Sequence, residues 1–146
     1  MTEHPISVSY IDQQIARAAA ALAAAGAWDA APVEMGCPDF HFVTLFMPYT
    51  RGGAGGSFDF RVDVSPDGTT FYQTSIYAPG VLVPGADTGS DVQREHVNYQ
   101  ATGAAAETFV FGPIELRGTI KELRVPAREV GNVGAPGTLA ITAVFS

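Results

Sequence analysis

The feature that most constrains the fold is a strictly alternating stretch at residues 57–64. Its apolar members are Phe58, Phe60, Val62 and Val64, and its polar members are Ser57, Asp59, Arg61 and Asp63. Because successive side chains of a β-strand point to opposite faces, the stretch predicts a strand with one buried and one solvated face. A Ser-Pro-Asp-Gly turn at residues 65–68 and a returning strand at 69–77 then predict a hairpin.

Short patterns of this kind, bounded by turn residues, continue along the chain. Residues 41–47 are apolar on both faces, which predicts a central strand that is covered on both sides. Further strands are predicted at residues 33–37, 94–100, 107–111, 114–125 and 138–145. Because no long crossover connects these strands, we predict an all-β fold, an antiparallel two-sheet β-sandwich of jelly-roll-like or immunoglobulin-like type.

The length of 146 residues suits one domain, which we place at residues 15–146. Residues 1–14 are predicted to form an irregular N-terminal arm, since Pro5 disfavours early regular structure. A loop rich in glycine and proline is predicted at residues 78–93, and a second glycine-rich loop at 128–137. Long loops of compact domains tend to carry contacts with partners.

The alanine-rich segment that follows the arm has two possible structures. Helical spacing of Ile11, Ile15, Ala19 and Leu22, together with the high helix propensity of alanine, favours a helix over about residues 13–25. A second pattern alternates as in a strand, at Leu22, Ala24, Gly26 and Trp28. The residues alone leave both structures open.

Charge and cysteine content narrow the classes of partner. The formal net charge is −7, and only eight basic residues are scattered along the chain. Without a basic stripe, binding to nucleic acid or to an anionic membrane is disfavoured. The single cysteine, Cys37, excludes an intramolecular disulfide, and the N-terminal segment is a poor signal peptide. We therefore expect synthesis in the cytoplasm without secretion.

Nothing in the sequence marks a site of chemistry. The glycine-rich residues 131–137 lack dinucleotide-loop spacing and precede a strand, and residues 51–56 lack the Gly-Lys-Ser/Thr of a phosphate-binding loop. Cys37 and His41 are four residues apart, but a zinc site or an activated nucleophile needs more partners than the chain's remaining histidines supply.

The acidic residues also lack the spacing of a known site. Asp59, Asp63 and Asp67, or Asp87 and Asp91, do not follow an EF-hand pattern. Asp59 and Asp63 flank Arg61 on the polar side of the predicted strand, which indicates ordinary solvated charge pairs. We therefore predict no enzymatic activity, no catalytic, cofactor-binding or metal-binding residues, and no cofactor.

Five aromatic residues allow either a binding or a structural role: Trp28, Tyr49, Tyr72, Tyr77 and Tyr99. Exposed on one surface, they would form a platform on which sugar rings stack. Aromatic residues also fill cores and interfaces, because each buries a large area. Both roles stay open from the sequence.

Three turn-rich stretches, residues 49–56, 65–72 and 125–139, together with residues 92–95, carry a family resemblance. Over residues 15–146 the chain resembles small β-sandwich virion proteins of tailed bacteriophages, which include capsid decoration (cement) proteins and related head or tail accessory proteins. The resemblance implies a jelly-roll-like domain, often trimeric, without enzymatic activity. It also implies that the alanine-rich segment is a strand near residues 17–28.

The resemblance leads to a functional hypothesis: a virion protein, most simply a capsid decoration protein that binds and stabilises the head shell. Its partners would be the major capsid protein or other virion proteins, and copies of itself in a homo-oligomer, with a trimer favoured. Residues 1–15 would act as the capsid arm, and residues 78–93 and 127–137 as contact loops. The alternative is a carbohydrate-binding module of a phage fibre or bacterial surface protein, with Trp28 or Tyr99 exposed to the sugar.

Overall fold

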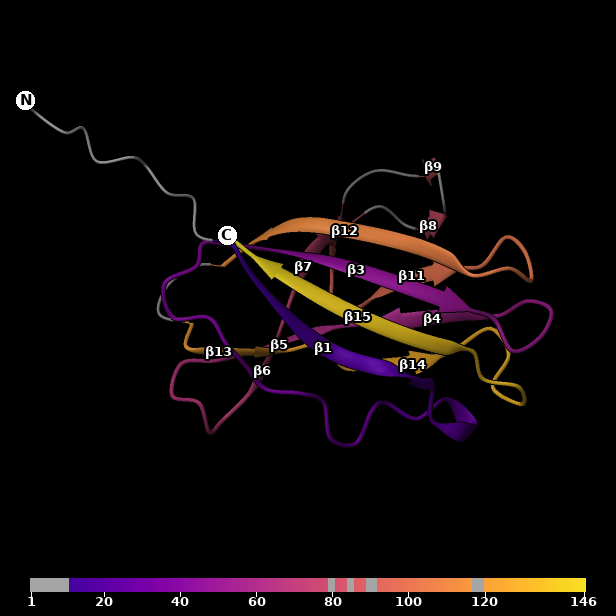
Figure 1. The fold of residues 1–146 in the computed structure, drawn as a ribbon, viewed down its shortest axis with the longest axis horizontal. Coiled ribbons are helices and arrows are strands. Elements are labelled where there is room, and N and C mark those ends of the chain that lie inside the picture. The colour runs from indigo at the N-terminus through magenta and orange to yellow at the C-terminus, as the bar shows by residue number, and fades with distance from the viewer. Residues whose placement is uncertain (1–10, 79–80, 84–85, 89–91, 117–119) are drawn as a thin grey trace, which may run out of the picture.

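The computed structural model describes residues 11–78, 81–83, 86–88, 92–116 and 120–146, and of residues 77–94 it describes the backbone alone. These residues fold almost entirely into strands that lie in two layers (Figure 1). The first layer is one four-stranded sheet in the order β1-β15-β3-β12. Its strands are β1 (Asp12–Ala21), β15 (Thr138–Phe145), β3 (Phe42–Thr50) and β12 (Glu107–Glu115).

The second layer consists of two sheets that share bent strands. The predicted strand at 57–64 forms as β4 (Ser57–Phe60) and β5 (Val62–Ser65), which Arg61 separates. β4 belongs to a five-stranded sheet, β14-β4-β11-β8-β9, and β5 to a four-stranded sheet, β2-β13-β5-β6. The other strands of the two sheets are β2 (Met35–Gly36), β6 (Tyr72–Thr74), β8 (Val81–Val83), β9 (Ala86–Thr88), β11 (Val97–Gln100), β13 (Glu122–Arg124) and β14 (Ala127–Glu129). β7 (Ile76–Ala78) and β10 (Val92–Arg94) pair with each other.

The strand order is that of a jelly roll. If β4–β5 and β13–β14 each count as one bent strand and β6 to β10 are set aside, eight strands follow in the order β1, β2, β3, β4–β5, β11, β12, β13–β14, β15. The first layer then holds strands one, eight, three and six, and the second layer strands two, seven, four and five. This interleaving, with the first strand beside the last, defines a jelly roll and confirms the predicted fold class.

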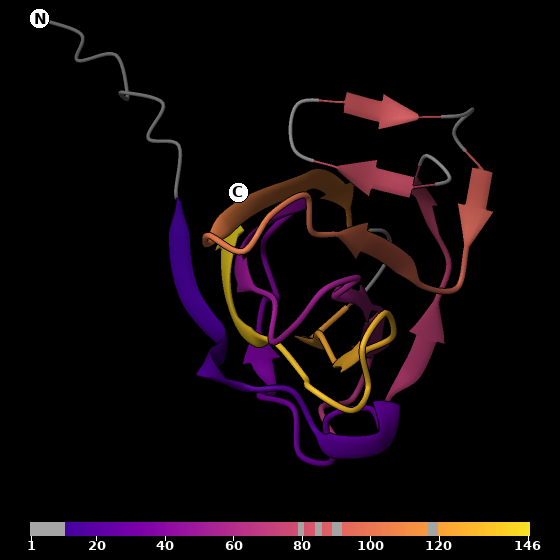
Figure 2. The same ribbon diagram turned by 90° about the vertical axis from the view of Figure 1, so that its right-hand side faces the viewer.

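The core lies between the layers and is rich in aromatic rings. The first layer contributes alternate residues of β3 and β15, and the second contributes Phe58, Phe60 and Tyr99. Ring centroids of Tyr99 and Phe109 are 4.1 Å apart, and those of Phe58 and Tyr99 are 5.6 Å apart. Figure 2, which looks along the strands, shows the first-layer strands curving around this core.

The helix predicted over residues 13–25 is wrong, because the segment pairs with β15 as strand β1. Asp12 lies opposite Phe145 and Ala21 opposite Thr138, and Ala16 is buried. Tertiary pairing therefore overrides the helix propensity of alanine. A strand here was implied by the family resemblance, although β1 spans Asp12–Ala21 rather than residues 17–28, and a short 3-10 turn follows at Ala24–Gly26.

Two other predictions need correction. Residues 12–14, assigned to the N-terminal arm, belong to β1, whereas residues 1–10 lie outside the described residues. The predicted loop at 78–93 contains the strands β8 and β9, and the two strands predicted at 107–125 form as β12 and β13 with changed limits. Within the described residues, no helix is long and apolar enough to cross a membrane.

Candidate interaction surface

The outer face of the first layer is open, although the sequence predicts a covered one. β3 lies in the middle of its sheet, as expected, and its inward residues Val43, Leu45 and Met47 are fully buried. The outward residues Phe42 and Phe46 are exposed. Among the described residues nothing covers these side chains, so the prediction that β3 is covered on both faces is wrong.

Three apolar side chains and one threonine lie in one row across this outer face. Register places Ile15 of β1 opposite Thr142 of β15, Thr142 opposite Phe46 of β3, and Phe46 opposite Val110 of β12. The exposed fractions are 64% for Ile15, 38% for Phe46 and 54% for Val110. The row therefore exposes apolar surface on β1, β3 and β12.

Charged residues of the four strands avoid the centre of this face. Asp12 and Glu107 lie opposite the inward residues Phe145 and Tyr49, so they share the inner side of the sheet. Glu115 lies opposite Phe42, at the end of β12. The outer face is therefore uncharged between its ends.

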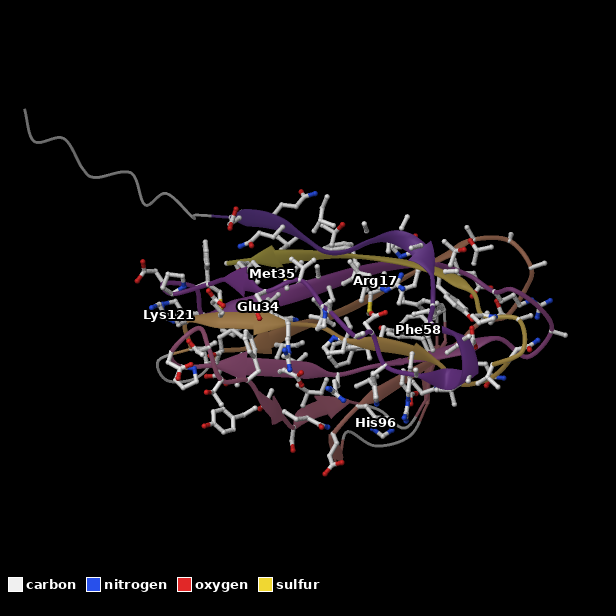
Figure 3. The ribbon with its side chains drawn as sticks, turned by 90° about the horizontal axis from the view of Figure 1, so that it is seen from below. Arg17, Glu34, Met35, Phe58, His96 and Lys121 are labelled. Atoms are coloured by element: carbon white, nitrogen blue, oxygen red, sulfur yellow. The ribbon has the colours of Figure 1, made fainter. Side chains whose placement is uncertain are left out.

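Arg17, the remaining charged residue of these strands, also turns away from the outer face. It lies opposite the inward residue Ile141, and its Nε donates to Asp29 Oδ2 at 3.0 Å. Its guanidinium further donates to the carbonyl oxygens of Ala20, Ala21 and Leu139. Figure 3 shows Arg17 on the first-layer side of the molecule, Phe58 between the layers and His96 on the far side.

On the opposite side of the molecule, acidic and basic side chains of the second layer form ion pairs with one another. Asp59 Oδ2 lies 3.0 Å from Arg128 Nη2, and Asp59 Oδ1 accepts from Asn98 at 2.9 Å. Asp63 pairs with Arg61 at 3.1 Å and with Arg124 at 2.9 Å.

Both aspartates are buried, with exposed fractions of 4% and 2% for Asp59 and Asp63. The prediction of solvated charge pairs at these positions is therefore wrong, because neighbouring strands bring arginines over them. Each carboxylate is instead paired with arginine in the folded protein.

Trp28 packs against the same network. The guanidinium carbons of Arg61 and Arg128 lie 4.7 and 4.4 Å from the centre of its ring, and His96 meets it edge-on at 6.2 Å. The half-buried indole therefore packs against the two guanidinium groups through cation–π contacts.

Among the aromatic residues whose side chains are described, the alternative of a sugar-binding platform is not supported. Tyr49 and Tyr99 are core residues, with exposed fractions of 0% and 3%. Tyr72 is exposed on β6, while the side chain of Tyr77 lies outside the described part of the chain. The expectation that Tyr99 is exposed to a sugar is therefore wrong, and burial explains the role of Tyr49 and Tyr99.

Glu129 is a buried carboxylate that sequence reasoning missed. Its Oε1 accepts from Tyr49 Oη at 2.6 Å and from Gly137 N at 2.8 Å, and its Oε2 accepts from the backbone amides of Ser57 and Asn132. Burial raises the pKa of Tyr49 above its ordinary value, and the hydrogen bond to Glu129 adds to the rise. The sequence feature that could have indicated this residue is an acid just before a glycine-rich stretch.

Glu129 connects the glycine-rich residues 51–56 and 131–137, because it accepts from Ser57 and Asn132 beside them. Asn132 donates from Nδ2 to the carbonyl of Ala54, and a Cβ on Gly131 would lie 1.9 Å from the carbonyl oxygen of Gly55. Only glycine permits this approach, so residues 131–137 form a packed structural loop. Their role as partner contacts stays a prediction.

The remaining predicted positions also have structural explanations. Burial raises the pKa of the Cys37 thiol to about 11, and the charge of Glu122 adds to the rise, whereas His41 is exposed. Asp67 accepts from the amides of Thr69 and Thr70 within the turn, which lowers its pKa. Among the described residues, no three His, Cys, Asp or Glu side chains gather as a metal site would require.

A hollow of about 240 Å³ lies beside β1. Its polar lining groups are Arg17 and Asp29, which are paired with each other, and alanines make up much of the rest. The two charged groups that line the hollow are therefore engaged in an ion pair with each other.

Fold and surfaces together define an all-β jelly-roll protein with an exposed, uncharged face on its first layer. No family model matches the chain, and no curated protein matches it. Among solved structures, it is similar to the crystal structure of SPBc2 prophage-derived protein YomS, with a TM-score of 0.42 and 10% sequence identity over 96% of this chain and 97% of that chain. A likeness at this level assigns neither family nor function.

Proposed function

We propose that the chain is a non-enzymatic structural protein of a bacteriophage virion, most simply a capsid decoration protein that binds and stabilises the head shell. The observation that carries the proposal is the exposed, uncharged outer face of the first layer, on a chain with a net charge of −7. The sequence resemblance to small phage virion proteins supports the same class.

The mechanism is adhesive rather than catalytic. A protein that binds the expanded shell but not the unexpanded one stabilises the expanded shell by mass action, by about 2.7 kcal/mol per site at a free concentration one hundred times the Kd. The partners are the major capsid protein or other virion proteins, and copies associate with one another, with a trimer favoured. An acidic chain suits a position outside the shell, away from packaged DNA.

Residues 1–15, 78–93 and 127–137 are the proposed contacts with the shell. Within the first range, Ile11 and Ile15 are among the most exposed large apolar side chains of the described residues. Burial of such side chains against a neighbouring subunit makes the free energy of binding more favourable.

The first experiment is quantitative mass spectrometry of purified phage particles from the source. Hundreds of copies per particle are expected for a decoration protein, and tens would indicate a tail or portal ring. Absence from particles while the chain is abundant in the lysate would contradict the proposal.

A second experiment tests the mechanism directly. Purified protein is added to expanded and unexpanded shells, and bound protein is measured after sedimentation. We expect binding to expanded shells alone, together with a higher shell disruption temperature. Equal binding to both shells would contradict stabilisation by mass action.

A further inference from the structure

Three arginines gather on the outer side of the second layer, the side that His96 marks in Figure 3, and outnumber the two aspartates beneath them. Arg61 and Arg124 share Asp63. The aspartate side chains are exposed by 5% or less, whereas those of Arg61, Arg124 and Arg128 are exposed by 24%, 27% and 31%. At these positions the charge that faces water is therefore positive, although the chain has a net charge of −7.

Contacts between side chains place the three guanidinium groups in a stripe with Arg61 in the middle. Arg61 meets Arg124 over Asp63, and it meets Arg128 over the ring of Trp28. Arg124 and Arg128 are four residues apart on the bent strand β13–β14, a span of up to ~13 Å at the rise of a strand. We name Arg124, Arg61 and Arg128 the arginine stripe.

The arginine stripe has more hydrogen-bond donors than its aspartates use. A guanidinium group has five N–H groups. Among the described residues, Arg61 and Arg128 each donate two hydrogen bonds to an aspartate, and Arg124 donates one. The other N–H groups can bind further carboxylates, which guanidinium groups hold with parallel hydrogen bonds.

Aromatic rings hold the stripe in position. Trp28 contacts Arg61 and Arg128, and the guanidinium carbon of Arg124 lies 4.3 Å from the centre of the Phe71 ring. Both rings are half-buried. Because ion pairs and rings orient the guanidinium groups before a ligand arrives, less side-chain entropy is lost on binding.

We propose that the arginine stripe binds an extended acidic segment of a partner protein, with a carboxylate on every second residue. Such side chains lie on one side of an extended chain, ~6.6 Å apart, so three carboxylates span ~13 Å, the length of the stripe. The inference goes beyond the proposed function, because it concerns a different surface from the outer face of the first layer and holds for any partner with such a segment.

The charge around the stripe favours a short protein segment over a long polyanion. Glu122 and the exposed Asp67 lie beyond Arg124, at the turn after β5. At the other end, the exposed Glu95 precedes His96, which contacts Trp28. A nucleic acid would extend from the stripe into these acids and into the field of an acidic chain, whereas a segment of about five residues ends before them.

The first test uses the full chain and a synthetic eight-residue peptide of alternating glutamate and threonine. Trp28 is the single tryptophan and contacts the stripe, so its emission reports binding. We expect a saturable change in emission. A peptide of the same composition with its glutamates in adjacent pairs should bind about threefold more weakly, because its carboxylates point to both sides. A peptide of glutamine and threonine should not bind.

A substitution in the middle of the stripe tests the site itself. Arg61→Gln leaves Asp63 paired with Arg124, so the fold is retained, and it should weaken binding of the alternating peptide about fivefold. The matched control is Arg51→Gln, the same change of charge on the loop between β3 and β4, which should bind like the wild type. Circular dichroism of each variant verifies that it is folded.

The positioning role of Trp28 is tested without any change of charge. Trp28→Leu removes the ring and should weaken binding of a fluorescein-labelled alternating peptide about threefold, measured by anisotropy. Trp28→Phe keeps a ring and should restore most of the affinity. Equal affinities of the two variants would refute the positioning role.

Several outcomes would overturn the inference: no binding of the alternating peptide, equal binding of the paired peptide, or unchanged binding by Arg61→Gln. Tighter binding of single-stranded DNA than of the peptide would assign the stripe to nucleic acid and would also overturn it. Failure here is separable from failure of the proposed function: a chain found on particles that ignores the peptide refutes the stripe alone, and a chain that binds the peptide but is absent from particles refutes the virion role alone.

Discussion

At the scale of single residues, Glu129 shows how a buried charge can organise a glycine-rich end of a sandwich. Both carboxylate oxygens accept two hydrogen bonds, from Tyr49 and three backbone amides. A buried carboxylate is tolerated when its lone pairs are satisfied in this way.

We predict that Glu129→Gln lowers the free energy of unfolding by about 2–4 kcal/mol, because the amide NH2 would face two backbone N–H donors. Urea denaturation measures the change. The matched control is Glu34→Gln at an exposed position, which should change stability by less than about 0.5 kcal/mol. Equal effects of the two substitutions would show that Glu129 does not fasten the loops.

The Cys37 thiol predicts a dependence of stability on alkaline pH. Its pKa is raised from 9.0 to about 11, so the folded protein keeps the proton at pH values where the unfolded chain loses it. The contribution is complete below pH 9 and is lost as the pH rises toward 11, by roughly 2 kcal/mol in total. Urea titrations of wild type and Cys37→Ala should converge over this range, and a constant difference would contradict the assignment.

The burial of a residue could be predicted from the sequence only where the local pattern of neighbouring residues determines it. The period-two pattern correctly placed Phe58 and Phe60 in the core. It could not show that Arg124 and Arg128, more than sixty residues later, lie over Asp63 and Asp59. Burial of those aspartates and of Glu129 depends on long-range pairing, which local spacing does not contain.

At the scale of elements, β1 is a strand made of residues that favour a helix. Its hydrogen-bonded register with β15 and the Arg17 guanidinium hold it in place. Arg17 binds three carbonyl oxygens as well as Asp29, and so ties β1 to the segment that follows it. Helix propensity of alanine could not reveal this anchor.

We therefore predict that Arg17→Ala lowers the free energy of unfolding by about 2–4 kcal/mol, because Asp29 loses its charge partner in a mostly buried setting. Amide exchange should accelerate first in β1 and β15. Lys121→Ala, at an exposed position, serves as the control and should leave exchange unchanged. A uniform acceleration across all strands would mean that β1 has no separate anchor.

The β3 strand illustrates a different limit of sequence reasoning. Its apolar pattern on both faces correctly predicts a central strand. It cannot distinguish cover by another layer of the same chain from cover by another molecule. The exposure of Phe42 and Phe46 shows that no second layer of the described residues covers this face.

At the scale of the whole molecule, turn spacing sufficed to predict a sandwich, because many short strands without crossovers have few other solutions. The interleaved strand order was predictable only as a class, since it depends on pairings such as Asp12 with Phe145 across the full chain.

If the homo-oligomer proposed above is the folded unit, its melting temperature must depend on protein concentration. We predict that a hundredfold increase raises the Tm of the wild type by about 4–7 °C, because mass action opposes dissociation during unfolding. Scanning calorimetry or fluorimetry measures the shift. A wild type whose Tm is independent of concentration would argue against coupled assembly and folding.

The position of Trp28 gives the molecule a built-in optical probe. It is the single tryptophan of the chain, and its ring contacts Arg61 and Arg128 on the second layer, away from the outer face of the first layer. Its emission therefore reports on one corner of the second layer. Association of copies through the first layer should leave the emission spectrum unchanged. Unfolding, which separates the indole from the two guanidinium groups, should shift it. A single fluorescence measurement can therefore distinguish association from unfolding.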